Sequence, residues 1–366
     1  MKDINTPDND SNELTIENIY SAIAKHIHQA RTNVIKAVNA EQVLAYWHIG
    51  KIIVTQEQAG ENRARYGKAL LENLSTRLQK DFGKGFGITN LKYMRQFYLT
   101  YQNRIGHEVR DEFDIEGFDE NLSWTHYRLL IKELRPEVRR FYEIEASKNG
   151  WSTPQLERQM TSFLFERLAA SKDTKSIMKL ASDGQIIQKP EDSLKNPYVL
   201  DFLGYKEHHS YTETDLESAI IDHLQDFLLE LGSGFAFIAR QKRITVEGEI
   251  FKPDLIFYHT ILKCYTIIDL KTTRLKHENV GQMMMYVNYY DREVKRKDDN
   301  PTIGLLLCAE HNETAVKYTL PEGNQQIFSR KYQLHLPTIE ELKQEVEREY
   351  KEAIQRLSLN EKDKQS

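Results

Sequence analysis

The chain has 366 residues, of which 40% are hydrophobic and 29% charged, a composition typical of a globular protein with two or three domains. Its formal net charge of -5 excludes a global basic field, so any contact with nucleic acid must depend on local basic patches. Its two cysteines lie in apolar runs, which indicates buried thiols and excludes a disulfide framework or a cysteine-rich zinc site.

The N-terminal residues 1–14 are polar and predict a disordered tail without the apolar core of a signal peptide. No run in the chain approaches the ~18 apolar residues that a membrane-spanning helix needs. We therefore expect a cytoplasmic protein that has no membrane partner.

Residues 15–170 have the periodicity of a helical domain. Apolar residues recur every three or four positions from Ile16 onward, as in Ile19, Ile23 and Ile27. A helix is predicted over 66–82, and a glycine-rich turn separates it from a second helix that begins near Thr89. Further helices are predicted to begin at Trp124, at Pro136 and near Pro154.

The two helices around the glycine-rich turn predict a helix-turn-helix-like unit that binds DNA. The polar face of the second helix supplies the candidate nucleic-acid-binding residues, which are Asn90, Lys92, Arg95 and Gln96. Arginine, asparagine and glutamine read base edges, whereas lysine contacts phosphate. The alternative is an ordinary helical hairpin whose polar face is solvated.

Residues 171–195 are polar and weakly periodic, and they predict a linker. A helix is expected over 214–231, followed by β-rich runs that alternate with a helix over 278–291. This mixture predicts an α/β sheet in a C-terminal domain of residues 196–345. A charged helix is predicted from 338 to 358, so that residues 346–366 form a C-terminal helix and tail. The fold class is therefore α+β with two domains, the first all-α.

Acidic residues fall at the ends of two neighbouring strand-like runs. Asp254 precedes one run, and Asp269 and Lys271 lie two residues apart near the end of the next. Residues i and i+2 of a strand point to the same face, so these three side chains can share one site. Two carboxylates beside an ammonium suit a magnesium ion and an activated water. The alternative is a turn aspartate at 254 and a local ion pair at 269 and 271.

Two flanking residues are further candidates. Gln282 shares a helix face with Tyr286 and Tyr289 and is harder to explain as core than its apolar neighbours. Glu217 lies in the first turn of the helix that precedes the sheet, where it could join a metal site. Alternatively, Glu217 closes a capping box that begins at Thr214 and has no part in the site.

Together these residues resemble a known enzyme superfamily. Glu217, Asp254 after Pro253, Asp269-x-Lys271 and Gln282 resemble the motif of the PD-(D/E)xK nucleases. Longer strings, such as Asn196-Pro197-Tyr198-Val199-Leu200 and Trp47-His48-Ile49-Gly50, are similar to the two domains of the bacterial YhcG family over nearly the whole chain. One departure is Asp269, where we expect glutamate in the family. Aspartate is one methylene shorter, which could retune the geometry of a bound metal.

The resemblance implies a restriction-endonuclease-like domain with a mixed central sheet that hydrolyses phosphodiester bonds. Mg²⁺, or Mn²⁺ in its place, would be held by Asp254, Asp269 and the Leu270 carbonyl, with Glu217 as a further candidate ligand. Lys271 would orient the attacking water or stabilise charge on the phosphate. Gln282 would position Lys271 or a phosphate oxygen.

The expected substrate is DNA, with RNA left open. The rival hypothesis is a non-catalytic nucleic-acid-binding, regulatory or assembly protein that keeps a nuclease-like fold. A homodimer is a further expectation, because cutting both strands of a duplex needs two sites.

Overall fold

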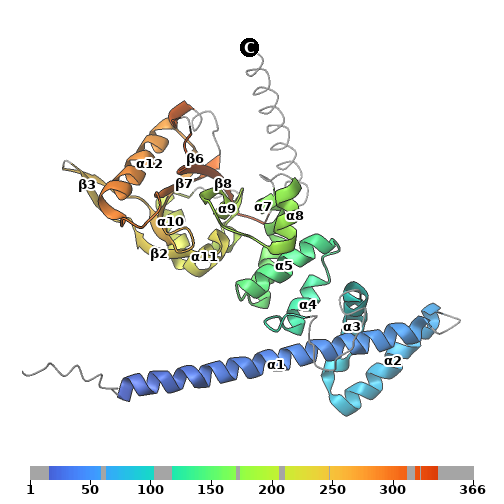
Figure 1. Ribbon diagram of the computed structural model, residues 1–366. Coiled ribbons are helices and arrows are strands. Elements are labelled where there is room, and N and C mark those ends of the chain that lie inside the picture. The colour runs from blue at the N-terminus through green and yellow to red at the C-terminus, as the bar shows by residue number, and fades with distance from the viewer. Residues whose placement is uncertain are drawn as a thin grey trace, which may run out of the picture. The chain divides into compact units, whose positions relative to one another are not determined.

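The computed structural model describes residues 16–58, 63–102, 118–169, 174–205, 211–246, 248–310, 318–321 and 323–336. The predicted disordered tail and the predicted C-terminal helix lie outside these residues. Contacts divide the chain into two compact units, Met1–Lys132 and Glu133–Ser366 (Figure 1). The division falls within the stretch that the sequence assigns to one helical domain.

The first unit is helical. It contains α1 (Ile16–Gln58), α2 (Arg63–Phe82), a 3₁₀ turn (Lys84–Phe86), α3 (Ile88–Tyr101) and α4 (Trp124–Leu130). The C-terminal half of α1 packs on α3 because Val43 and Trp47 are buried there, as are Leu91 and Met94 of α3. Gly50 makes the close approach possible, since a Cβ at that position would lie 2.1 Å from the Met94 carbonyl oxygen.

The second unit begins with helices that pack beside the sheet domain. They are α5 (Pro136–Lys148), α6 (Thr153–Thr161), α7 (Leu164–Ala169), α8 (Thr174–Asp183) and α9 (Pro190–Ser193). The last two lie in the segment predicted as a linker. Leu180 and Ala181 of α8 are buried, and α8 packs on α5. In its described part, this segment is therefore folded into the second unit.

A six-stranded mixed sheet forms the centre of the second unit. Its order is β1 (Tyr198–Val199), β8 (Ile327–Gln333), β7 (Ile303–Glu310), β6 (Cys264–Arg274), β5 (Leu255–His259) and β2 (Phe235–Arg240). The β2–β5–β6 pairings are antiparallel and the β6–β7–β8–β1 pairings are parallel. The predicted fold class, a helical first domain and a mixed-sheet second domain, is confirmed. A separate hairpin, β3 (Ile244–Val246) and β4 (Glu249–Phe251), connects β2 to β5.

Helices cover both faces of the sheet, which explains the nearly continuous apolar runs of its central strands. One face packs on α10 (Glu213–Asp222) and α11 (Leu224–Leu231), and the other on α12 (His277–Tyr289) (Figure 1). The prediction of one continuous helix over 214–231 was wrong. The backbone leaves the helical region at His223, with φ -111° and ψ 35°, and two helices form instead. Neither proline nor glycine marks this break in the sequence.

A buried ion-pair network joins α6 and α7 to α11. Glu230 on α11 accepts hydrogen bonds from Arg167 at 2.5 Å and from Arg158 at 3.3 Å. The side chains of Arg167 and Glu230 are fully buried. Lys195 donates to the Glu230 carbonyl. The helical part of the second unit is therefore anchored to the sheet domain by charge as well as by apolar packing.

Candidate functional site

The register of β5 and β6 brings the two predicted aspartates together. Leu255 pairs with Ile268, so the same antiparallel register, carried one residue further, places Asp254 opposite Asp269. The Leu270 amide donates a 2.7 Å hydrogen bond to Asp254 Oδ2. Because β5 begins only at Leu255, residues 269–271 of β6 pair with β7 on one side and lie beyond the β5 pairing on the other.

The side-chain ammonium of Lys271 contacts oxygen atoms of three residues. Its Nζ lies 2.8 Å from Asp269 Oδ2, donates to the Leu270 carbonyl oxygen at 3.1 Å and contacts Glu213 Oε2 at 3.2 Å. The ammonium thus contacts a carboxylate and a carbonyl that the sequence predicts as metal ligands. Sequence reasoning missed Glu213, which starts α10 and has no motif of its own.

The two aspartate carboxyl groups of this cluster have raised pKa values because they are shielded from solvent and close to one another. Burial and the neighbouring Asp269 charge raise the pKa of Asp254 to about 8. Burial also raises the pKa of Asp269, against the opposing effect of Lys271. For Lys271, burial alone would lower the pKa, but Asp269, Asp254 and Glu213 raise it above its usual value. The cluster therefore has more negative charge than one lysine balances.

These residues fit a hard divalent cation. Asp269 Oδ2 is buried, and Lys271 Nζ lies 2.8 Å from it. Among the described residues, no three His, Cys, Asp or Glu side chains converge as a metal site. The available ligands are thus two carboxylates and the Leu270 carbonyl. Mg²⁺ commonly binds through one or two carboxylates and keeps several waters.

Glu217 lies near the cluster but is held by other partners. The helix cap belongs to Thr212 and Asp215, so the capping-box reading of Glu217 was wrong. Glu217 is 1% exposed, and its two oxygens accept from Arg240 Nε at 2.7 Å and Gln241 Nε2 at 2.5 Å. Gln241 has a left-handed backbone, with φ 43°, and its amide donates to the Asp254 carbonyl. Glu217 thus fixes the end of β2 beside Asp254.

Gln282 is exposed on α12 and contacts the site through a tyrosine. Its Nε2 donates to Tyr286 Oη at 2.8 Å, and no bond joins it to Lys271 within the described structure. Burial, together with the charges of Asp269 and Asp254, raises the pKa of Tyr286 to about 12. Tyr286 lies on the helix face that the sequence assigns to Gln282 and Tyr289, and its side chain is buried.

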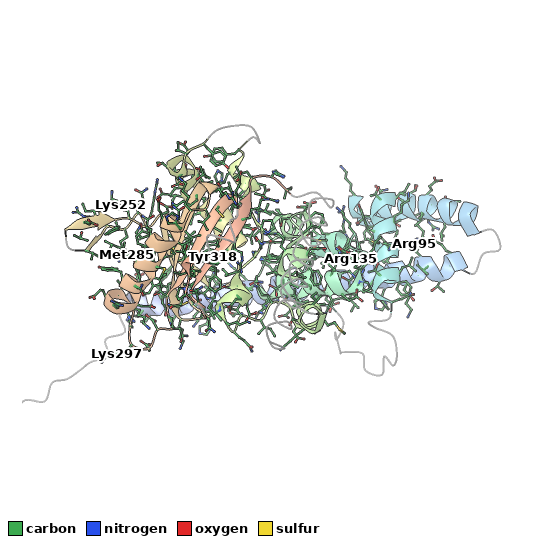
Figure 2. All side chains as sticks on the ribbon, turned by 90° about the horizontal axis from the view of Figure 1, so that it is seen from above. Arg95, Arg135, Lys252, Met285, Lys297 and Tyr318 are labelled. Atoms are coloured by element: carbon green, nitrogen blue, oxygen red, sulfur yellow. The ribbon has the colours of Figure 1, made fainter. Side chains whose placement is uncertain are left out.

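The four candidate nucleic-acid-binding residues on α3 divide into two pairs. Asn90 donates to the Gly85 carbonyl and accepts from Trp124 Nε1, so it holds the turn and α4. Arg95, labelled in Figure 2, forms a 2.5 Å ion pair with Glu57 of α1. Lys92 and Gln96 are exposed. Gln96 also donates to Thr100 Oγ1 at 3.3 Å, so three of the four form hydrogen bonds or ion pairs within the first unit.

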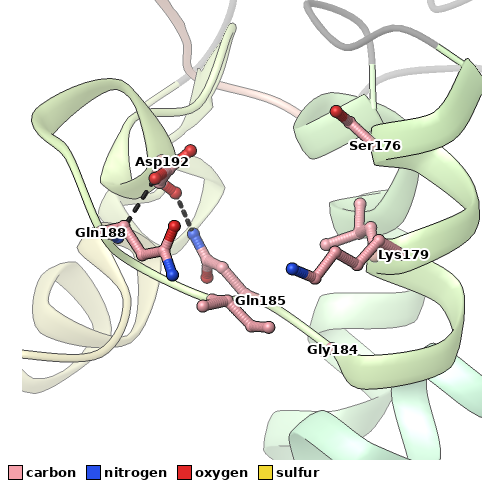
Figure 3. Close-up of a pocket in the computed structure, with 8 residues that line it drawn as sticks. Ser176, Lys179, Gly184, Gln185, Gln188 and Asp192 are labelled. Carbon is pink, nitrogen blue, oxygen red and sulfur yellow. Dashed lines mark hydrogen bonds between the residues drawn. The ribbon is translucent and has the colours of Figure 1, made fainter.

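A cavity elsewhere in the second unit is unrelated to the carboxylates. It has a volume of about 180 Å³ and lies between α8 and the turn before α9, lined by Lys179, Gly184, Gln185 and Asp192 among others (Figure 3). Gln185 Nε2 donates to the Asp192 carbonyl, and the Gln188 amide donates to Asp192 Oδ2. These bonds stabilise the turn that follows Gly184.

The described residues include no helix that is both long and apolar enough to cross a membrane.

Comparisons with known proteins match most of the chain. Residues 191–347 match the family described as YhcG PDDEXK nuclease domain, and residues 22–167 match the DUF1016 N-terminal domain. A relative from Escherichia coli (strain K12), named "Putative nuclease YhcG", is 35% identical over 353 residues, which cover 91% of this chain and 94% of the relative.

Two solved structures resemble part of the chain. A repair endonuclease from Pyrococcus abyssi has a TM-score of 0.24 and 21% identity, with 36% of this chain and 50% of that one covered. An EndoMS–dsDNA complex has a TM-score of 0.25 and 16% identity, with 37% and 50% covered. This chain thus matches about half the length of each. From the family matches and the full-length relative, the chain belongs to the YhcG family, and its C-terminal region is that family's PDDEXK nuclease domain.

Proposed function

We propose that this protein is a Mg²⁺-dependent nuclease that hydrolyses phosphodiester bonds in DNA, with Mn²⁺ as a competent substitute. One observation carries the proposal. The half-buried Asp254 lies opposite the buried Asp269, and burial raises the pKa of both carboxyl groups. Carboxylates forced together in this way, beside a backbone carbonyl, are typical of a cation site.

In the proposed site, Asp254, Asp269 and the Leu270 carbonyl hold the metal. The bound ion would polarise the phosphate and lower the pKa of a coordinated water. Lys271 keeps Glu213 as a partner once Asp269 is engaged, since Glu213 lies 3.2 Å from Nζ. Its ammonium then orients the attacking water and stabilises charge that develops on the phosphate.

Two other residues support the site in this proposal. Glu217 positions Asp254 indirectly by holding Arg240 and Gln241 at the end of β2. Gln282 is exposed next to Tyr286 and is free to donate to a phosphate oxygen when substrate is present. Glu217 is therefore assigned a positioning role, and Gln282 a substrate contact.

Basic side chains beside the site supply the local patch that a chain of net charge -5 needs for DNA. Lys242 and Arg243 before β3, and Lys252 after β4, are exposed on the segment that leads to Asp254. In the first unit, Lys92 and Gln96 are the two predicted contacts on α3 that have exposed side chains. We assign all of these to phosphate contacts rather than to base reading.

The proposed location is the cytoplasm. Both cysteines, Cys264 and Cys308, are free buried thiols. Burial raises the pKa of the Cys264 thiol to about 12, so this thiol is not reactive. Buried free thiols suit a reducing compartment.

The test is a cleavage panel with the purified full-length protein on single- and double-stranded DNA and RNA. Mg²⁺ and Mn²⁺ should support cutting of DNA, and Ca²⁺ or EDTA should not. Lys271→Ala should abolish cleavage while leaving DNA affinity within about threefold, because binding depends on several phosphate contacts. If the wild-type protein binds DNA but cuts no substrate with either metal, a non-catalytic nucleic-acid-binding protein is the better description.

A further inference from the structure

The first half of α1 carries a row of large apolar side chains that are exposed to solvent. The exposed fraction is 86% for Ile16, 65% for Tyr20, 54% for Ile23, 47% for Ile27 and 63% for Val34. The second half of the same helix is different. Buried residues begin at Ala40, where α1 packs on α3 and α4.

The spacing of this row is that of a coiled coil. Alternating steps of four and three residues connect Ile16, Tyr20, Ile23, Ile27, Ala30, Val34 and Ala37. Apolar residues at such steps form a straight seam along one side of a helix. They occupy the a and d positions of a heptad repeat. The steps place Tyr20, Ile27 and Val34 at a, and the other four at d. No charged residue interrupts the seam until Glu41, where the helix joins its own unit.

This seam is a longer exposed apolar surface than monomeric proteins usually have. Single exposed aliphatic residues are common, but the largest apolar patch on a monomer is typically about 300–600 Å². Residues 16–38 extend over roughly 34 Å of helix at a rise of 1.5 Å per residue. Ile19 and Val38, at g and e positions, flank the seam with exposed fractions of 44% and 60%, and they widen the patch further.

We propose that residues 16–38 of α1 form a two-stranded coiled coil with the same segment of a second copy of this chain. A heptad seam needs a partner helix with the same 3.5-residue repeat, and a second copy supplies one in matching register. The β-branched Ile27 and Val34 at a favour two strands, whereas isoleucine at d, as in Ile16 and Ile23, favours three, so a trimeric mass would overturn the two-stranded form. Two facing patches of several hundred Å² each reach the lower range of stable interfaces, about 1,200 Å² in total.

The side of α1 away from the seam is consistent with this assignment. Lys36, at a c position, forms an ion pair with Glu120 of its own unit at 3.2 Å. This contact leaves the seam open while the helix stays attached to the folded part of its unit. The inference does not depend on the proposed nuclease activity, since a non-catalytic protein would dimerise equally well through this seam.

The experiment measures the mass of the full-length protein by sedimentation velocity from about 1 to 50 µM. The wild type should sediment as a dimer, and the dimer should persist at 0.5 M NaCl because an apolar seam is little affected by screening. Ile23→Glu combined with Ile27→Glu should weaken dimerisation at least 100-fold and give a monomer. Both side chains are exposed, so the melting curve of the folded units should be unchanged.

The matched control adds the same two charges to the outer side of the same segment. Ser21 and Thr32 lie at b and f positions and are exposed, so Ser21→Glu with Thr32→Glu should remain a dimer. A monomeric wild type, a seam variant that stays dimeric, or a control that dissociates equally would each overturn the proposal. A monomeric wild type that binds vesicles of phosphatidylglycerol would instead identify the seam as a membrane-binding face.

Discussion

Two buried charge clusters in the second unit differ in their balance. Around Glu230, the cations Arg158, Arg167 and Lys195 surround a carboxylate whose two oxygens are both bonded. Burial alone would raise the pKa of Glu230, but these cations hold it near 2. Around Asp254 and Asp269, acids outnumber the single lysine and both carboxyl pKa values rise.

The difference separates structure from chemistry. A buried carboxylate whose partners match it in charge and hydrogen bonds stabilises the fold, because it is ionised and fully bonded. A buried carboxylate pair that lacks compensation opposes folding, and proteins keep such pairs where a ligand supplies the missing charge. Burial by itself therefore identifies neither kind of cluster, whereas the direction of the pKa shift distinguishes them.

The largest expected effect comes from neutralising one acid of the site. Asp254→Asn keeps the acceptor for the Leu270 amide but removes a proposed metal ligand and the cost of burying a second carboxylate beside Asp269. Cleavage should fall by about 10³-fold or more, whereas the free energy of unfolding without metal should rise by about 1 kcal/mol. Single-turnover cleavage and urea unfolding measure the two quantities. Activity within tenfold of wild type would remove Asp254 from the proposed site.

The opposite result is expected in the balanced cluster. Glu230→Ala leaves Arg167 buried without a counter-charge, which should lower the free energy of unfolding by about 3–5 kcal/mol. Glu230 has no contact with the site residues among the described bonds, so cleavage per folded molecule should be unchanged. Urea unfolding at 15 °C, where more of the variant is folded, tests the first statement. A loss below 1 kcal/mol would show that the network contributes little.

A third buried group, His259, has a pKa that burial lowers to about 4. Its Nδ1 accepts from the Leu262 amide and its Nε2 has no partner, so the ring is held neutral. The unfolded chain binds a proton near pH 6.5 and the folded chain does not, so stability is present above pH 6.5 and is lost as pH falls toward 4.

The expected slope from His259 is up to about 1.4 kcal/mol per pH unit in that window. His259→Gln retains an acceptor but cannot titrate, so urea unfolding between pH 7.5 and 5 should show a shallower slope for this variant. Parallel slopes for the two proteins would mean that His259 is protonated in the folded state.

The smallest expected effect concerns the partner of Lys271 that no motif predicted. Glu213→Gln removes an ion pair whose acidic side chain is 42% exposed. Such a pair contributes at most about 1 kcal/mol, so cleavage should fall by about fivefold or less. Glu191→Gln, an exposed glutamate of α9, is the control and should have wild-type activity. A loss of 100-fold at Glu213 would instead indicate a direct role in the reaction.

Much of the fold followed from local signals in the sequence. Pro136 and Pro154 lie in the first turns of their helices as expected, because proline is favoured at helix starts. The buried strands were readable from their apolar runs. The break at His223 and the helices between 174 and 193 were not, since tertiary packing stabilises them and no breaker residue or strong period marks them.

The contacts of the site also fall into those that local sequence predicts and those that depend on tertiary packing. The contact between Asp269 and Lys271 follows from strand periodicity, which is local. Glu213 is 58 positions from Lys271, and Arg240 is 23 positions from Glu217, so these contacts depend on how α10 packs on the sheet. On α3, sequence polarity marked Asn90 and Arg95 as surface readers, but their partners come from α4 and α1.

The anchoring of α6 and α7 has a consequence for how small a working piece of this protein can be. The nuclease match begins at residue 191, yet two of the cations that compensate Glu230, Arg158 and Arg167, precede it. A fragment that begins at residue 191 would leave the buried Glu230 carboxylate without these two cations and would expose the surface of α11 that they cover. A piece that retains this compensation must therefore begin before Arg158, and the compact unit that contains it begins at Glu133, about sixty residues upstream of the family boundary.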